Sequence, residues 1–166
     1  MHESAQSSGL EIRQAGVDDV PILLDFVRAL AEYEKLAHEV TATEESLRDS
    51  LFGPKPMAEA LLGFSNDEPV CFAVYFFNYS TFLGKRGMYL EDLFVKPAHR
   101  GLGFGKAILM HLASLALEQG CGRFEWSVID WNQGAIEFYK GLGATILQDW
   151  RICRLSEAAL KRLTQI

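Results

Sequence analysis

The segment of this chain with the clearest capacity for chemistry is the glycine-rich run Arg100-Gly101-Leu102-Gly103-Phe104-Gly105-Lys106, between a predicted strand and a predicted helix. Glycines let a backbone approach a ligand closely, and the first N–H groups of a helix have no partner inside the helix. With the positive end of the helix dipole, these groups can hold an anion, to which Arg100 can add a charged donor. A structural turn at a helix start is the alternative for such a loop taken alone.

Two common nucleotide-binding patterns do not fit this loop. The dinucleotide pattern GxGxxG requires a glycine where Lys106 stands. The Walker pattern requires a glycine in place of Arg100 and a serine or threonine in place of Ala107. The pattern that does match is Arg-x-x-Gly-x-Gly, placed between a strand and a helix.

Two neighbouring carboxylates, Glu91 and Asp92, interrupt an otherwise apolar predicted strand just before the loop. Successive side chains of a strand point to opposite faces, and an unpaired buried charge is costly. At least one of the two therefore needs a polar cleft or a basic partner. A cleft would suit proton transfer, whereas a basic partner would make the pair part of a structural salt bridge.

The elements that must hold these residues can be located from periodicity, caps and turn residues. Asp18 and Asp19 suit the start of a helix, Thr41 or Thr43 suits the N-cap of a second, and Ser156 suits the N-cap of the last. We expect helices over about 18–31, 43–52, 106–118, 132–141 and 156–166, and strands over 10–13, 58–64, 70–79, 88–95, 123–129, 144–147 and 150–155. Short turns between strands predict antiparallel pairs, whereas strand, glycine loop, helix and strand over 88–129 predict a parallel, right-handed βαβ unit.

Length and composition limit what kind of protein this chain can be. Its 166 residues, 49% of them apolar, suit one globular domain, which we place at 9–166 after a disordered tail at 1–8. A net charge of −6 disfavours nucleic-acid binding and is compatible with a cationic substrate. Neither a secretory signal nor a membrane-spanning stretch is found, so we expect a cytoplasmic protein. Three cysteines without CxxC spacing predict neither a disulfide framework nor a metal site.

The loop pattern and a second block resemble the GNAT family of acetyltransferases. The second block is Asp130-Trp131-Asn132, followed by Ala135-Ile136-Glu137-Phe138-Tyr139-Lys140-Gly141-Leu142-Gly143-Ala144. More closely, Leu30-Ala31-Glu32-Tyr33-Glu34, Tyr89-Leu90-Glu91-Asp92-Leu93-Phe94-Val95 and Trp150-Arg151 resemble the spermidine/spermine (diamine) N-acetyltransferases and their thialysine-acetylating relatives. The resemblance covers about residues 10–163. It implies a mixed α/β (α+β) fold, with a twisted, mostly antiparallel central sheet flanked by helices and a βαβ core that binds acetyl-CoA.

The resemblance also implies a role for each matching residue. The backbone of Leu93, Phe94 and Val95 would pair with the pantetheine arm, and the pyrophosphate would be held by Arg100, Gly101, Leu102, Gly103, Phe104, Gly105 and Lys106. Asn132 would contact the cofactor beyond the point where two strands diverge. Tyr139 would stand beside the thioester sulfur as general acid, and Glu91 would accept the amine proton, directly or through water. The amine site would be lined by Tyr33, Glu34, Glu91, Asp92 and Trp150.

The implied reaction is acetyl transfer from acetyl-CoA to a primary amine of a small cationic substrate, by direct attack in a ternary complex and without a metal. An alkylamine has a pKa of about 10.4 and arrives protonated, so it needs a proton acceptor before it can attack. Because the family is commonly dimeric, we expect a homodimer, with neither nucleic acid nor membrane as a partner.

The acceptor stays open at this point. Phe82 stands where the diamine enzymes tend to carry a tryptophan, and the segment before Trp150 is shorter than theirs. A protein or peptide amine, an aminoglycoside or an amino acid are therefore alternatives to a polyamine, a diamine or a thialysine-like compound. A non-catalytic acyl-CoA-binding sensor is the alternative from a different functional class.

Overall fold

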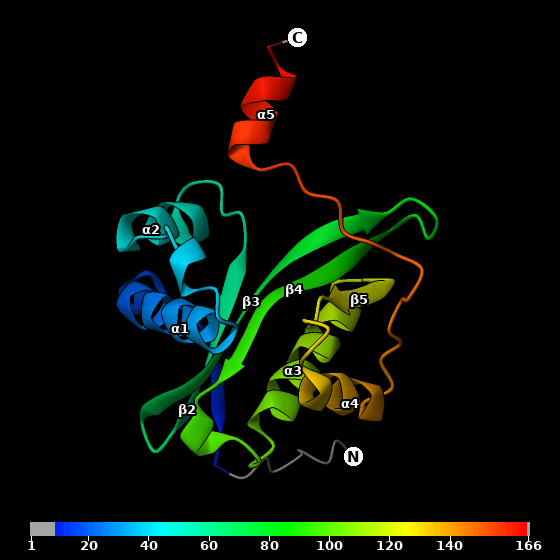
Figure 1. Cartoon of the computed structure of the whole chain (residues 1–166). Coiled ribbons are helices and arrows are strands. Elements are labelled where there is room, and N and C mark those ends of the chain that lie inside the picture. Colours follow the sequence, from blue (N-terminus) through cyan, green and yellow to red (C-terminus); the bar gives the residue numbers. More distant parts are fainter. Residues whose placement is uncertain (1–8, 166) are drawn as a thin grey trace. The chain divides into compact units, whose positions relative to one another are not determined.

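The computed structural model describes residues 9–165 (Figure 1), so the tail predicted at 1–8 lies outside the described residues. The chain divides into two compact units, Met1–Ser127 and Val128–Ile166. The first unit carries a β-sheet with helices on both of its faces. The second unit contains two short helices joined by an extended segment.

The first unit is built around a five-stranded sheet in the order β1-β2-β3-β4-β5. The strands are β1 (Glu11–Gln14), β2 (Glu59–Ser65), β3 (Glu68–Ser80), β4 (Lys85–Val95) and β5 (Arg123–Trp126). Strands β1 to β4 pair antiparallel with their neighbours, and β5 pairs parallel to β4. The mixed, mostly antiparallel sheet and the parallel βαβ unit predicted from the sequence are therefore confirmed. The crossover helix of that unit is α3 (Phe104–Glu118).

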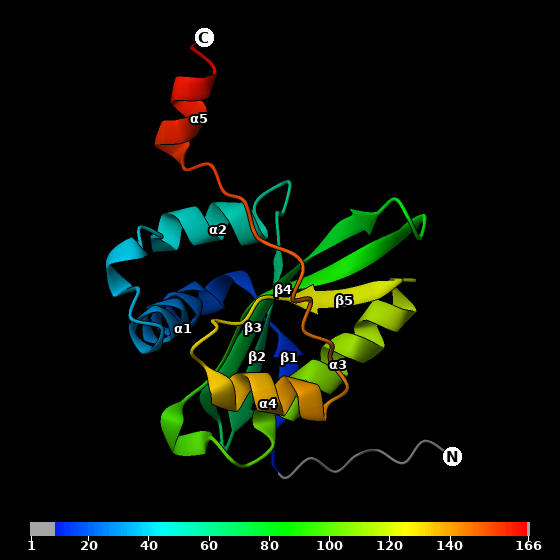
Figure 2. The ribbon, with the colours of Figure 1, turned by 45° about the vertical axis from the view of Figure 1, so that its right-hand side comes forward.

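Helices cover both faces of this sheet, as Figure 2 shows. The helices α1 (Val20–Tyr33) and α2 (Glu44–Phe52) lie on one face, and α3 lies on the other. The predicted cap of α2 is confirmed for Thr43, whose hydroxyl oxygen accepts a hydrogen bond of 3.1 Å from the Ser46 N–H. A side-chain cap of this kind satisfies one of the helix's unpaired first-turn donors.

A hydrophobic core lies under α1 and α2. Phe26 of α1 stacks on Phe72 of β3 with 5.1 Å between ring centroids, and it meets the Phe94 ring of β4 edge-on at 6.4 Å. All three side chains are at most 5% exposed. Burial of three aromatic rings stabilises this face strongly, since each removes a large apolar area from water. Phe94 thereby fixes the end of β4 that carries the candidate site.

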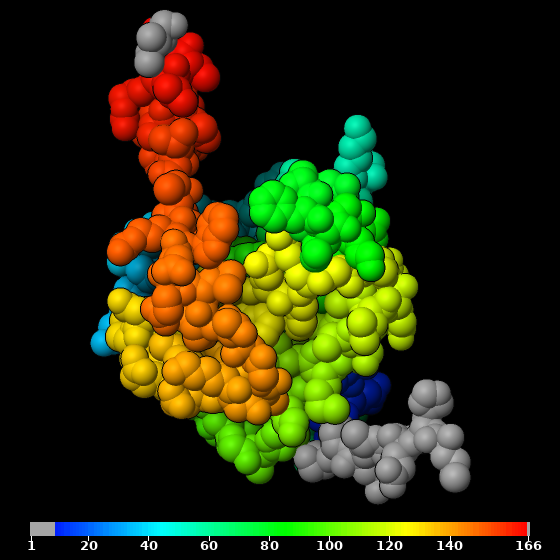
Figure 3. All heavy atoms as spheres, turned by 90° about the vertical axis from the view of Figure 1, so that its right-hand side faces the viewer, coloured from blue at the N-terminus to red at the C-terminus, as the bar shows by residue number. Residues whose placement is uncertain are grey.

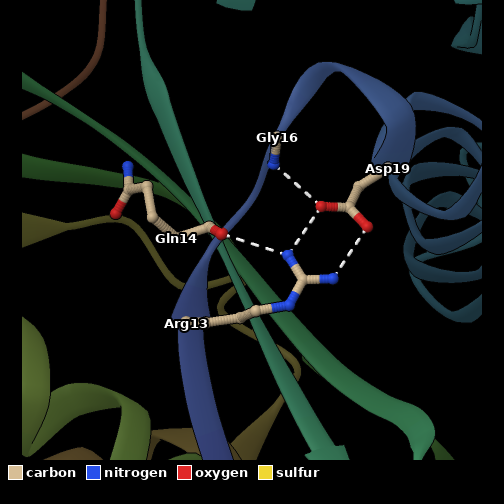
Figure 4. Close-up of polar contacts among 4 residues, drawn as sticks. All are labelled: Arg13, Gln14, Gly16 and Asp19. Carbon is tan, nitrogen blue, oxygen red and sulfur yellow. Dashed lines mark hydrogen bonds and ion pairs between the residues drawn. The ribbon is translucent and has the colours of Figure 1, made fainter.

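An ion pair fixes the start of α1 against β1 (Figure 4). Both terminal nitrogens of Arg13 donate to the Asp19 carboxylate, at 2.7 and 2.9 Å, and the Gly16 N–H donates to the same carboxylate at 2.8 Å. These hydrogen bonds lower the pKa of Asp19 from its ordinary value, and those from Arg13 have the largest effect. A bidentate pair of this kind gives geometric specificity as well as energy. It sets the angle at which the chain leaves β1 and enters the helix.

The second unit consists of α4 (Gln133–Gly141), α5 (Glu157–Leu163) and the extended chain between them, which Figure 3 colours orange. The strands predicted over 144–147 and 150–155 are wrong, because this stretch forms no strand and Trp150 is 79% exposed. Apolar residues in extended chain form a strand only when a neighbouring strand supplies hydrogen bonds. The predicted Ser156 cap of the last helix is confirmed, since its hydroxyl accepts from the Ala159 N–H at 3.3 Å.

Candidate active site

The glycine loop leads into α3 in a conformation that suits an anion. Gly101 and Gly103 have φ angles of 79° and 82°, in the left-handed region that glycine adopts without strain. Gly103 is the N-cap of α3 and supplies no side-chain hydrogen bond to the first turn. A Cβ added at either glycine would meet nothing within 4 Å, so both face open space. The mouth of α3 thus combines unshielded backbone with the positive end of a helix dipole.

The other loop residues divide into exposed and buried side chains. Leu102 and Lys106 are exposed, whereas Phe104 is buried in the core at 3% exposure. Phe104 can therefore serve a bound anion only through its backbone. The His99 ring stacks on it with 6.4 Å between centroids, which ties the short helix η3 (Pro97–His99) to the start of α3.

The pairing of β4 with β5 stops before the loop, because β5 ends at Trp126, and we call this place the fork. Their pairing begins at Gly87 with Arg123 and ends at Leu90 with Trp126, while β4 continues to Val95. Within the described residues, the β5-side edge of β4 is therefore without a strand partner over 91–95. An unpaired strand edge can hydrogen-bond an extended ligand much as it would another strand. This is where the sequence places the backbone of Leu93, Phe94 and Val95 as a contact for the pantetheine arm.

A β-bulge rearranges the two carboxylates at this fork. Val74 of β3 pairs with Asp92, but Tyr75 pairs with Leu90, which leaves Glu91 without a partner on β3. Val74 packs on the core under α1 and α2, so Asp92 opposite it lies on that face of the sheet. In a bulge, two residues of one strand oppose one residue of the other. The strict alternation from which the sequence assigned Glu91 and Asp92 to opposite faces is interrupted at this point.

The Asp92 carboxyl lies close enough to two other carboxyl groups, those of Glu91 and Glu34, to feel their charges. Burial first, then the charges of Glu91 and Glu34, raise the pKa of Asp92 to about 6. Burial also raises the pKa of Glu34, the residue that ends α1. Within residues 9–165, no salt bridge links any of the three to a basic side chain, so the alternative of a structural ion pair finds no support. Such a group attracts cations and disfavours its own full ionisation until one binds.

Tyr33 and Arg100, predicted for the amine and the pyrophosphate respectively, meet in the structure. The Arg100 guanidinium carbon lies 4.5 Å from the centroid of the Tyr33 ring. The Arg100 Nε–H also donates to the Val95 carbonyl oxygen at 3.0 Å. The first unit thus brings together most of the residues predicted for both substrates: Tyr33, Glu34, Glu91, Asp92, Leu93, Phe94, Val95 and 100–106.

The remaining predicted residues belong to the second unit. Asn132 is the N-cap of α4, and its side-chain oxygen accepts from the Ala135 N–H at 3.2 Å. Tyr139 lies on α4, partly exposed, with its ring centroid 5.4 Å from that of Phe138. Trp150 lies in the extended segment before α5. Within this unit the cap orients the helix that carries Tyr139.

One polar pair at the fork escaped prediction. The hydroxyl groups of Tyr89 in β4 and Ser127, just past β5, are 2.9 Å apart. Neither residue stands out in the sequence, because their meeting depends on the register of β4 against β5. The strand sequences carry no local signal for that register.

None of the helices within 9–165 has the length and apolar character needed to cross a bilayer. Over the same residues, no group of three or more His, Cys, Asp or Glu side chains is placed to hold a metal ion.

Solved structures share this architecture. An integron cassette protein from the mobile metagenome of V. cholerae superimposes with a TM-score of 0.78 at 25% identity, covering 96% of this chain and 99% of the other. An aminoglycoside acetyltransferase from an uncultured soil sample superimposes with a TM-score of 0.75 at 16% identity, covering 89% and 96%. The second likeness concerns the fold alone.

Sequence comparison adds the family. Residues 24–144 match the acetyltransferase (GNAT) family. A thialysine N-epsilon-acetyltransferase from Sus scrofa is 40% identical over 163 residues, which cover 92% of this chain and 95% of that protein. The L-ornithine N5-acetyltransferase NATA1 of Arabidopsis thaliana is 33% identical, covering 93% of this chain and 88% of that protein. The chain shares this fold and matches curated acetyltransferases over nearly their whole length. It is therefore a member of the GNAT family and an acetyl-CoA-dependent N-acetyltransferase.

Proposed function

We propose that this enzyme transfers the acetyl group of acetyl-CoA to a primary amine of a small cationic substrate: a polyamine, a diamine or a thialysine-like compound. The observation that carries the proposal is the acidic face formed by Glu34, Asp92 and Glu91 beside the fork of β4 and β5. A cation bound there would offset the mutual repulsion and burial that raise the Asp92 pKa. The names of relatives that act on thialysine and ornithine support the same class of acceptor.

The geometry of the loop and the fork supports the roles proposed for most of the cofactor-side residues. The backbone at 101–106, with Arg100 and Lys106 as cations, would hold the diphosphate. The open edge of β4 at Leu93, Phe94 and Val95 would hydrogen-bond the pantetheine arm, and Asn132 would be a further contact of the cofactor. Each of these roles uses an N–H group or a charge and requires no metal.

The chemical step would be a direct attack in a ternary complex. Glu91 would accept a proton from the substrate ammonium group, directly or through water, which frees the nitrogen lone pair to attack the acetyl carbon. As the carbon–sulfur bond breaks, Tyr139 would give its hydroxyl proton to the departing sulfur. Tyr33, Glu34, Asp92 and Trp150 would bind the rest of the amine. The region 9–166 would act as one catalytic domain, and the predicted homodimer and cytoplasmic location stay predictions.

A substrate panel tests the proposal. Thiol release from acetyl-CoA is measured with putrescine, spermidine, spermine, thialysine, lysine, ornithine, an aminoglycoside and a basic peptide, with Tyr139→Phe as the matched low-turnover control. We expect the highest kcat/KM for a small di- or polyamine or a thialysine-like amino acid. Selective activity on the peptide or the aminoglycoside would contradict the proposed acceptor but keep the family chemistry. Tight coenzyme A binding without thiol release for any amine would instead favour an acyl-CoA sensor.

A further inference from the structure

Arg100 bridges three parts of the first unit. Its Nε–H donates to the Val95 carbonyl oxygen at 3.0 Å, at the end of β4. Its guanidinium lies over two aromatic rings, 4.5 Å from the Tyr33 centroid and 5.3 Å from the Phe94 centroid. The two rings are themselves 6.4 Å apart. The side chain that opens the glycine loop thus contacts the end of α1 as well as β4.

The end of α1 that Arg100 contacts is rigidly built. The Leu36 N–H donates to the Ala31 carbonyl at 2.7 Å, and the Lys35 N–H donates to the Glu32 carbonyl at 3.1 Å. Lys35 has a φ of 62°. These two bonds around a left-handed residue form the Schellman motif that closes many helices. Because Tyr33 and Glu34 are the last residues before this turn, whatever holds the Tyr33 ring also holds the backbone from which the Glu34 side chain extends.

We propose that Arg100 is a positioning residue for the amine: its guanidinium anchors Tyr33, and through it Glu34, against β4 opposite Asp92. This inference rests on the proposed function for the meaning of the acidic face, and it goes beyond the pyrophosphate contact expected of Arg100. The loop that receives the cofactor and the helix end that receives the amine then share one side chain. A flat guanidinium suits this task, because it can stack on rings while its Nε–H bonds a carbonyl; a lysine ammonium does not stack in this way.

Arg100→Lys separates the two roles of Arg100. Lysine keeps a positive charge for the diphosphate but loses the stacking and the Nε–H bond. We expect the KM for the amine to rise roughly two- to fivefold, the size of an exposed cation–π contact. The KM for acetyl-CoA and the affinity for coenzyme A should change less. Arg86→Lys is the matched control, since Arg86 also lies over an aromatic ring, 4.8 Å from the Phe77 centroid, but outside the proposed site.

A double-mutant cycle tests the contact itself. In a Tyr33→Phe background the ring remains, so Arg100→Lys should raise the amine KM by the same factor as in the native chain. In a Tyr33→Leu background the ring is gone, so Arg100→Lys should have no further effect. The inference is overturned if Arg100→Lys weakens only coenzyme A binding, or if its effect on the amine is the same in the Tyr33→Leu background.

A second readout keeps this test separate from the proposed function. The melting temperature of the same variants is measured without any ligand, and Arg100→Lys should lower it more with an aromatic ring at position 33 than in the Tyr33→Leu background, where only the Phe94 contact and the Val95 hydrogen bond remain to be lost. If no amine supports turnover, the proposed function fails while this coupling still stands. If the panel finds the expected amine but neither cycle shows coupling, the inference about Arg100 fails alone.

Discussion

The Asp92 carboxyl of β4 lies within electrostatic reach of Glu34 at the end of α1: burial first, then the charges of Glu91 and Glu34, raise the Asp92 pKa to about 6. A protein rarely places like charges together on a partly buried surface without compensation, and functional sites are where such arrangements cluster. Here the two groups come from a helix and a strand far apart in the sequence. Substitutions of Asp92 and Glu34 should therefore have different effects, one on stability and one on binding of the amine.

Asp92→Asn should stabilise the free enzyme at neutral and alkaline pH. Because the Asp92 pKa rises from 3.8 to about 6 on folding, the folded chain keeps a proton that the unfolded chain has released between these values. The free energy of unfolding therefore falls as the pH rises from about 4 to about 6, and the loss persists above that range. Its upper limit is on the order of 3 kcal/mol. Thermal melts should show the variant above the native chain at pH 8 and equal to it near pH 4. An equal or lower melting temperature for the variant at pH 8 would refute the assigned burial.

Glu34→Gln should weaken binding of the amine while leaving the cofactor side intact. The substitution removes one charge from the acidic face, so we expect the KM for a cationic amine to rise by about fivefold, corresponding to roughly 1 kcal/mol. Coenzyme A affinity, measured by calorimetry, should not change. Glu32→Gln on the exposed side of the same helix is the control. Equal effects of the two substitutions would show that only net charge matters.

Gly103→Ala should impair both stability and cofactor binding. An alanine at φ 82° is strained by roughly 1–2 kcal/mol, although its Cβ meets no neighbour. Gly84→Ala at the turn between β3 and β4 is the matched control, since Gly84 has φ 61° and an equally open environment. Both variants should lose similar stability in thermal melts, but Gly103→Ala alone should lose affinity for coenzyme A. Unchanged coenzyme A binding would argue against the loop as the diphosphate site.

Tyr139→Phe should lower kcat by about 10²–10⁴, the range expected for loss of a general acid. Because the ring remains, coenzyme A affinity and the melting temperature should stay near those of the native chain. Tyr79→Phe, at an exposed tyrosine of β3, controls for loss of a hydroxyl elsewhere. Steady-state rates of thiol release decide the point, and a kcat within twofold of the native value would exclude the role.

Asp19→Asn should destabilise the fold most at neutral pH. The hydrogen bonds from Arg13 lower the Asp19 pKa, so this stabilisation is fully present above the ordinary value of 3.8 and is lost as the pH falls through the lowered value. The partly buried Asp19 carboxylate accepts hydrogen bonds from Arg13 and Gly16, so removing its charge should cost about 1–3 kcal/mol. Denaturant unfolding at pH 7 and at acid pH should show a gap between variant and native chain that closes in acid. Asp18→Asn, at an exposed neighbour, should show no gap at either pH.

Much of the architecture could be predicted locally. The cap at Ser156 and the glycine loop before α3 were placed correctly from short patterns, and the cap at Thr43 was one of the two positions predicted for α2. Such signals involve residues within a turn of one another, so they act before the chain is folded. The strands at 144–147 and 150–155 failed for the opposite reason, because a strand exists only where another strand pairs with it.

The sequence by itself thus determined the type and order of the elements of the sheet unit, the glycine loop and the family, since each depends on residues close together in the chain. Only the tertiary structure decided which residues of the candidate site meet. The bulge at Glu91 depends on the register of β3 against β4. The meeting of Arg100 with Tyr33 depends on α1 packing over Phe94. Register and packing are set by the whole hydrophobic core, so no local pattern encodes them.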